Sequence, residues 1–325
     1  MTSTATVRSF PTTDGTRLAL HWQGNPQAAL TLVLAHGWTL DSRVWGPVVD
    51  LLAPSLDVRV LRYDHRGHGR SDPAPPGTTT IAQLADDLAD LLCGVVSGPV
   101  VLAGHSMGGM AIMALAERYP DLVAQRVVGA VFVATSGGQL MPLDFGLQPL
   151  LGRLLARGEA RLLRAESIAL RLRGREWTIR RAGLVRPGVR WLLFGEHPRR
   201  ADIDLTARCM AQGRPGNIVD FRPTFDDHDR AAALTAFAHV PTLVLAGTRD
   251  RLIPVRHAAA IAAALPDATL VRYAGAGHMV LLERAEQVAT RISELVSRVL
   301  TARMGPARPG GDAAHGTGVS AAGWR

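Results

Sequence analysis

The sequence predicts an α/β fold: a mostly parallel, doubly wound sheet with an inserted helical cap. Short apolar runs alternate with helix-like segments in the first half of the chain and again near its end. Runs such as 30–35 and 127–134 are as apolar as strands buried on both faces. Strands and helices in this rhythm form crossover units of a parallel sheet.

The individual elements follow in chain order. Residues 5–23 predict two short strands around the turn Thr13-Asp14-Gly15, which is typical of a hairpin. Thr80 is expected to cap one helix and Pro120 to stop another. The later strands are expected at 30–35, 58–63, 99–103, 127–134, 240–247 and 268–273, and the helices at 43–52, 81–96, 107–119, 255–265 and 280–300.

The rhythm breaks between residues 138 and 235, which read as helices without sheet strands. Because it resumes afterwards, the break predicts an insertion into one domain. We therefore expect a core from residues 1–137 and 236–303, a helical cap from 138–235, and a disordered Gly/Ala/Pro-rich tail from 304–325. No secretory signal and no spanning apolar run is found, so the expected location is cytoplasmic.

Positive charge is concentrated in one part of the chain. The formal net charge is +8, while residues 151–200 alone hold 13 Arg and four Glu. Leucines and arginines alternate at helical spacing over 150–172, which favours a cap helix with its arginines in water. A basic face in weak contact with a membrane or lipid surface is the alternative. No nucleic-acid-binding motif is found, so no nucleic-acid partner is expected.

The strongest chemical signal is Gly104-His105-Ser106-Met107-Gly108, between a predicted strand and a predicted helix. This is the G-x-S-x-G pattern of a nucleophile elbow in the context that it requires. Glycines on both sides of Ser106 let the chain turn sharply, so that the hydroxyl stands at the sheet edge. A glycine-rich turn without chemistry is the alternative interpretation.

A serine nucleophile needs a base and a group that orients the base. His278 lies in a glycine-rich loop between the last predicted strand and the last predicted helix, and Asp250 follows the strand 240–247. The order Ser, Asp, His is that of the α/β-hydrolase fold. Asp144 is the serious alternative acid, and Asp267 a poorer one because it lies in the turn before a strand.

A tetrahedral intermediate also needs two N–H donors for its oxyanion. The N–H of Met107, directly after the nucleophile, would supply one. The N–H of Trp38, in the turn His36-Gly37-Trp38 after an early strand, would supply the other, and its indole could line the acyl site. The turn could also be an ordinary strand ending.

With these motifs, the sequence resembles the cap-bearing serine hydrolases of the α/β-hydrolase superfamily. The loop 64–71, Asp-His-Arg-Gly-His-Gly-Arg-Ser, is similar to that family's D-x-R-G-x-G-x-S segment, and the resemblance covers about 8–134 and 238–300. It implies a triad of Ser106, Asp250 and His278, an oxyanion hole at Trp38 and Met107, a cap, and no cofactor. Relatives with an aspartate nucleophile are disfavoured because position 106 is serine.

Other groupings predict less. His65 and His68 lie three apart in a Gly-rich loop without an obvious third ligand, so no metal is expected there. The run 226–229, Asp-Asp-His-Asp, is expected to cap the following helix. Six aromatic residues of the insertion could line an acyl pocket or form the cap's own core: Phe145, Trp177, Trp191, Phe194, Phe221 and Phe225.

The leading functional hypothesis is hydrolysis of a carboxylic ester, lipid-like or thioester substrates included, through an acyl-enzyme, with a small acyl compound as the partner. Acyl transfer, carbon–carbon bond hydrolysis and cofactor-free perhydrolysis could use the same groups. A ligand-binding protein that retains the fold without catalysis is the alternative from another functional class.

Overall fold

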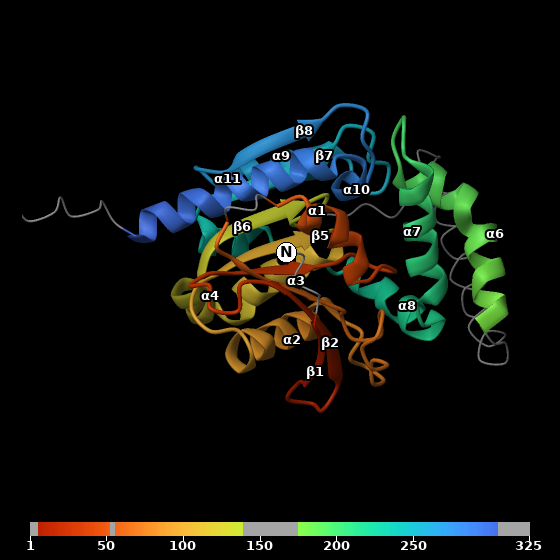
Figure 1. The fold of residues 1–325 in the computed structure, drawn as a ribbon, viewed down its shortest axis with the longest axis horizontal. Helices are drawn as coiled ribbons and strands as arrows, with labels where there is room; N and C mark the ends of the chain where they lie inside the picture. The colour runs from red at the N-terminus through yellow and green to blue at the C-terminus, as the bar shows by residue number, and fades with distance from the viewer. Residues whose placement is uncertain (1–5, 53–55, 139–174, 305–325) are drawn as a thin grey trace, which may run out of the picture.

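A computed structural model describes residues 6–52, 56–138 and 175–304 (Figure 1). Its centre is an eight-stranded sheet in the order β1-β2-β4-β3-β5-β6-β7-β8. The β1–β2 hairpin is antiparallel, as is the β2–β4 pair, and every further pairing is parallel. The predicted fold class is confirmed. The strands are β1 (Thr6–Pro11), β2 (Arg17–Gly24), β3 (Thr31–Ala35), β4 (Arg59–Tyr63), β5 (Val100–His105), β6 (Val127–Val133), β7 (Thr242–Gly247) and β8 (Thr269–Tyr273).

Helices cover both faces of the sheet, and each face has its own apolar core. Strand β5 is buried along its whole length, with Leu102 in one core and Val101 and Ala103 in the other. This alternation explains the continuous apolar runs in the sequence. Helices α2 (Ile81–Gly94), α3 (Met107–Arg118) and α9 (Val255–Ala263) pack on the first face, and α1 (Gly46–Asp50), α10 (Val280–Glu283) and α11 (Ala285–Met304) on the second.

Several predicted helices differ in detail. Thr80 caps α2 as expected, accepting from the N–H of Gln83 at 3.1 Å. Pro120 follows the end of α3 but also begins a new helix, α4 (Pro120–Arg126), because proline is favoured at the first helical position. The helix expected at 43–52 starts as a 3-10 turn, η1 (Ser42–Trp45). The one expected at 280–300 is divided at Arg284 into α10 and α11.

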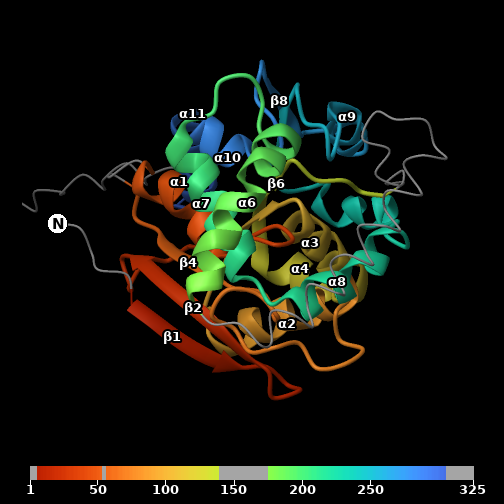
Figure 2. The ribbon, with the colours of Figure 1, turned by 90° about the vertical axis from the view of Figure 1, so that its right-hand side faces the viewer.

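The described part of the insertion is helical. It contains α6 (Arg175–Leu193), α7 (Arg200–Gln212), α8 (Pro215–Phe221) and the 3-10 turn η2 (Arg222–Phe225). Helices α6 and α7 pack against each other, with an ion pair of 2.8 Å between Arg186 and Asp204. Figure 1 shows these helices together at one end of the molecule, opposite the end of α11, and in Figure 2 that end faces the viewer. Residues 139–174, which include the basic segment 150–172, lie outside the described residues.

The two ends of the insertion meet at its base. The N–H of Arg230 donates to the carbonyl of Gly137 at 2.6 Å, and Gly138 forms an antiparallel bridge with Asp229. The buried ring of His228 bonds the carbonyl of Ser136 at 2.9 Å. The capping expected of 226–229 is therefore wrong: the turn η3 (Ala231–Phe237) begins after Arg230 with no side-chain cap.

Among the described residues, no helix combines the length and apolar character needed to cross a membrane.

Candidate active site

Ser106 lies at the carboxyl end of β5 in a backbone conformation that few residues adopt. Its φ is 53° and its ψ is −118°, and α3 begins at the next residue. Its N–H donates to the carbonyl of Val133 at 2.9 Å, and its own carbonyl accepts from the hydroxyl of Thr135 at 2.7 Å. The neighbouring strand therefore holds the strained turn in place, as a nucleophile elbow requires.

The glycines of the elbow are needed for close packing. A Cβ on Gly104 would lie 2.5 Å from the backbone of Gly108, and a Cβ on Gly108 would lie 2.4 Å from the carbonyl of Ala35. Helix α3 therefore approaches β5 and β3 more closely than any side chain at these positions would allow. The N–H groups of Met107 and Gly108, at the start of α3, lie directly after the serine, where a helix offers no acceptor of its own; those of Gly109 and Met110 already donate to the carbonyl of Ser106, at 2.9 and 3.2 Å.

His278 and Asp250 meet at the same sheet edge. The Nδ1 of His278 and Oδ2 of Asp250 are 2.8 Å apart, and the two side chains are 4% and 0% exposed. The other oxygen of Asp250 accepts from the N–H groups of Leu252 and Ile253, at 2.9 and 2.8 Å. With a carboxylate accepting its Nδ1–H, the imidazole keeps Nε2 free to accept a proton.

His105 connects this pair to the elbow. Its Nε2 bonds the carbonyl of His278 at 3.1 Å, and the two rings have centroids 4.9 Å apart. Complete burial holds the pKa of His105 well below its ordinary value, so the ring is neutral and donates from Nε2. The residue before Ser106 thus holds the backbone of His278, a contact that no pattern in the sequence predicts.

The turn His36-Gly37-Trp38 lies against the serine. A Cβ on Gly37 would be 3.2 Å from the Cβ of Ser106 and 2.8 Å from Nδ1 of His105. The indole of Trp38 donates to the carbonyl of Ile218 in α8 at 2.9 Å and packs edge-on to Phe225. Trp38 therefore joins the core to the insertion.

Three buried histidines, His36, His65 and His68, lie at or beside that turn. Nε2 of His36 accepts from the N–H of His65 at 2.9 Å, and Nε2 of His65 bonds the carbonyl of His36 at 3.1 Å. Nδ1 of His68 bonds the carbonyl of Arg66 at 3.0 Å. Burial lowers the pKa of His36 and of His65, and lowers that of His68 to about 4, so all three rings are neutral at pH 7. Within the described ranges, no group of three or more potential ligands could hold a metal ion.

A family profile described as "Alpha/beta hydrolase family" matches residues 32–291 of the chain. The chain belongs to this family. An uncharacterized protein of Mycobacterium tuberculosis is 30% identical to this alpha/beta hydrolase in an alignment of 278 residues that covers 83% of the chain and 75% of the relative. A pimeloyl-[acyl-carrier protein] methyl ester esterase of Aromatoleum aromaticum is 28% identical over 82% of the chain and 97% of the relative.

Solved structures agree with this assignment. The structure of a thermophilic esterase from Thermogutta terrifontis is 26% identical to this alpha/beta hydrolase, with a TM-score of 0.69. The match covers 91% of the chain and 100% of the esterase. The family and these esterase relatives support a hydrolase activity.

The other candidate residues of the sequence differ in their placement. Asp267 is exposed between α9 and β8, and the alternative acid Asp144 is outside the described residues. Of the insertion's aromatic residues, Phe194 and Phe221 are fully buried core residues, whereas Trp191 is 51% exposed. Phe225 packs on Trp38, while Phe145 and the side chain of Trp177 are not described.

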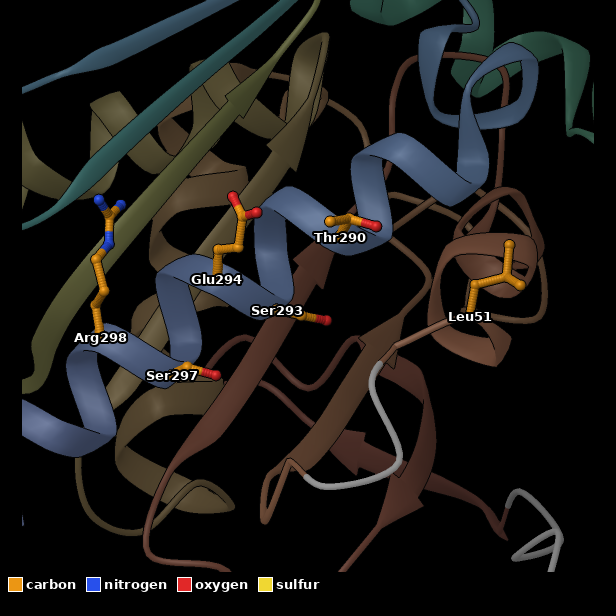
Figure 3. Close-up of a pocket in the computed structure, with 6 residues that line it drawn as sticks. All are labelled: Leu51, Thr290, Ser293, Glu294, Ser297 and Arg298. Atoms are coloured by element: carbon orange, nitrogen blue, oxygen red, sulfur yellow. The ribbon is translucent and has the colours of Figure 1, made fainter.

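A surface pocket lies on the outer side of α11, beside Leu51 (Figure 3). Two of its polar side chains are engaged within the helix: the hydroxyl of Thr290 donates to the carbonyl of Glu286, and Glu294 pairs with Arg291 at 2.9 Å. This pocket shares no residue with the serine–histidine centre. It is lined by Leu51, Thr290, Ser293, Glu294, Ser297 and Arg298.

Proposed function

We propose that this alpha/beta hydrolase cleaves carboxylic esters, with Ser106 as nucleophile, His278 as base and Asp250 as the residue that orients the base. The observation that carries the proposal is the buried hydrogen bond that Nδ1 of His278 donates to Oδ2 of Asp250, next to a serine in an elbow conformation. A serine hydroxyl becomes nucleophilic when such a base takes its proton.

The reaction has two halves. In the first, Oγ of Ser106 attacks the carbonyl carbon while its proton passes to Nε2 of His278. His278 then protonates the departing alcohol, which leaves an acyl group on Ser106. In the second half, water gives a proton to His278 and attacks the acyl-enzyme. The carboxylic acid leaves, and the proton returns to Ser106.

Charge develops on the substrate's carbonyl oxygen in both halves. The N–H groups of Met107 and Trp38 would donate to it, the first from the start of α3 and the second from the turn beside Ser106. Gly37 permits this placement, since a side chain there would meet Ser106 and His105.

A panel of p-nitrophenyl esters with acyl chains of increasing length tests the proposal. The wild type is expected to hydrolyse at least one ester, and Ser106→Ala to lose the activity by a factor of about 10⁶, as removal of a triad serine does. Full activity in Ser106→Ala would show that another group is the nucleophile. Mass analysis of the products with an added alcohol separates hydrolysis from acyl transfer.

A further inference from the structure

The carboxylate of Glu283, at the end of α10, binds two loops at once. Its Oε1 accepts from the N–H of Gly277 at 2.7 Å, one residue before His278. Its Oε2 accepts from the N–H of Gly195 at 2.9 Å, in the insertion between α6 and α7. Hydrogen bonds to an ionised acceptor are stronger than those between neutral groups, so this side chain is well suited to fix both backbones.

The same two loops also bond each other directly. The N–H of Glu196 donates to the carbonyl of Gly275 at 2.8 Å, and that of Met279 to the carbonyl of Leu193 at 3.0 Å. A Cβ on Gly195 would lie only 1.9 Å from the carbonyl oxygen of Gly275. The segment 193–196 and the histidine loop 275–279 therefore pack backbone against backbone.

The loop that carries Asp250 is tied to the same place. The guanidinium of Arg251 donates to the carbonyls of Trp191 and Phe194, at 2.6 and 3.2 Å. The N–H of Arg249 donates to the carbonyl of Ala276 at 2.8 Å. The acid loop, the histidine loop and the end of α6 thus form one connected unit.

We infer that Glu283 is a positioning residue, which sets the backbone of His278 and joins it to segment 193–196 of the insertion. This inference rests on the proposed function for its catalytic consequence. Burial raises the pKa of Glu283, and the N–H groups of Gly277 and Gly195 oppose that rise. Half-burying a carboxylate costs free energy unless the carboxylate has hydrogen-bond partners. In Glu283, the N–H groups of Gly277 and Gly195 are these partners.

Glu283→Gln is the most informative substitution because glutamine has nearly the same shape. Its amide has one acceptor oxygen, and its NH₂ group faces a second N–H donor, so one of the two loops loses its acceptor. Glu283→Ala removes both acceptors. Glu286→Gln is the matched control: this residue is exposed three positions later on α11.

Two measurements are made on each full-length variant. The first is the rate at which a fluorophosphonate labels Ser106, together with kcat and KM for p-nitrophenyl acetate. The second is hydrogen exchange in peptides that cover 193–196 and 275–279. In Glu283→Gln we expect labelling and kcat to fall about tenfold, with a smaller change in KM, and both segments to exchange faster. Glu286→Gln should match the wild type in every measurement.

Each outcome decides a separate point. Unchanged exchange in both Glu283 variants would overturn the joint anchoring of the two segments. Faster exchange with wild-type labelling and kcat would overturn the positioning role. A wild type that does not label would instead refute the proposed function, while the exchange data would still decide whether Glu283 joins the two segments.

Discussion

The Nδ1 atom of His278 lies 2.8 Å from Oδ2 of Asp250, and solvent reaches almost none of either side chain. This bond fixes which ring nitrogen carries the proton and leaves Nε2 as the nitrogen that can accept one. Burial strengthens the interaction because water cannot compete for the carboxylate.

Replacing Asp250 by asparagine is expected to lower kcat by about 10³- to 10⁴-fold, because the amide NH₂ would face Nδ1 and favour the wrong tautomer. The oxygen that accepts from Leu252 and Ile253 can be retained, so the fold should persist. Steady-state kinetics with a p-nitrophenyl ester and a thermal melt check both points. The exposed Asp267→Asn should behave as the wild type, and equal losses in the two variants would contradict the assignment.

Gly37→Ala is expected to reduce kcat/KM by about 10²- to 10³-fold, as loss of one oxyanion donor does. The added Cβ would meet Nδ1 of His105 at 2.8 Å and so push the turn that carries Trp38 away from Ser106. Gly183→Ala in α6 is the matched control, since a Cβ there meets nothing within 4 Å. Wild-type activity in Gly37→Ala would show that the turn carrying Trp38 does not form part of the oxyanion hole.

Trp38→Phe is expected to raise KM up to about tenfold with a smaller effect on kcat, because one hydrogen bond to the insertion is lost. Phenylalanine retains an aromatic ring against Phe225 but cannot donate to Ile218. The comparison variant is Trp191→Phe, at a residue that is 51% exposed. Kinetics that separate kcat from KM test the expectation, and a fall confined to kcat would argue against a link through α8.

The buried ion pair of Arg66 and Asp87 predicts a large stability effect. Both side chains are fully buried, and Arg66 also binds Asp14 at 2.7 Å. Asp87→Asn removes the negative charge that pairs with the buried guanidinium of Arg66. It should lower the free energy of unfolding, measured in urea, by about 3–5 kcal/mol. The neighbouring Asp86→Asn, which breaks a partly exposed pair with Arg118, should cost less than about 1 kcal/mol. Similar losses in both would be contrary to this account.

Stability should also depend on pH through the buried histidines. The pKa of His68 falls from 6.5 to about 4 on folding, so between these pH values the unfolded chain binds a proton that the native protein does not. The free energy of unfolding therefore decreases as pH falls, by about 1.4 kcal/mol per pH unit for each such group. The difference between the urea midpoints at pH 7.5 and 5.5 should be smaller in His68→Asn than in the wild type, and unchanged in the exposed His239→Asn. An unaltered pH dependence in His68→Asn would exclude His68 as a cause.

Much of the fold follows from the sequence because its signals are local. The apolar run at 100–105 predicts a strand buried on both faces, and the glycines around Ser106 predict the close approach of α3. Pro120 shows the limit of such signals: it ends one helix and begins the next, and the residue alone does not separate these two roles.

The placement of site residues follows in part. The order of Ser106, Asp250 and His278 along the chain, each after a strand, predicts their meeting at one sheet edge, although their catalytic roles stay predictions. Glu283 and His105 were not predicted, because each acts through a backbone group of a loop that only the tertiary structure brings near. The spacing of Glu283 after His278 was the available signal, and nothing in it indicates a contact with Gly195.

Intact-mass analysis after treatment with a fluorophosphonate tests whether Ser106 is the nucleophile. A hydroxyl reacts with this reagent only when a base activates it, so the wild type should gain one adduct and Ser106→Ala none. His278→Ala, expected to fold, should label far more slowly than the wild type. A folded wild-type protein that gains no adduct, or an adduct that persists in Ser106→Ala, would contradict the assignment of Ser106 as the nucleophile.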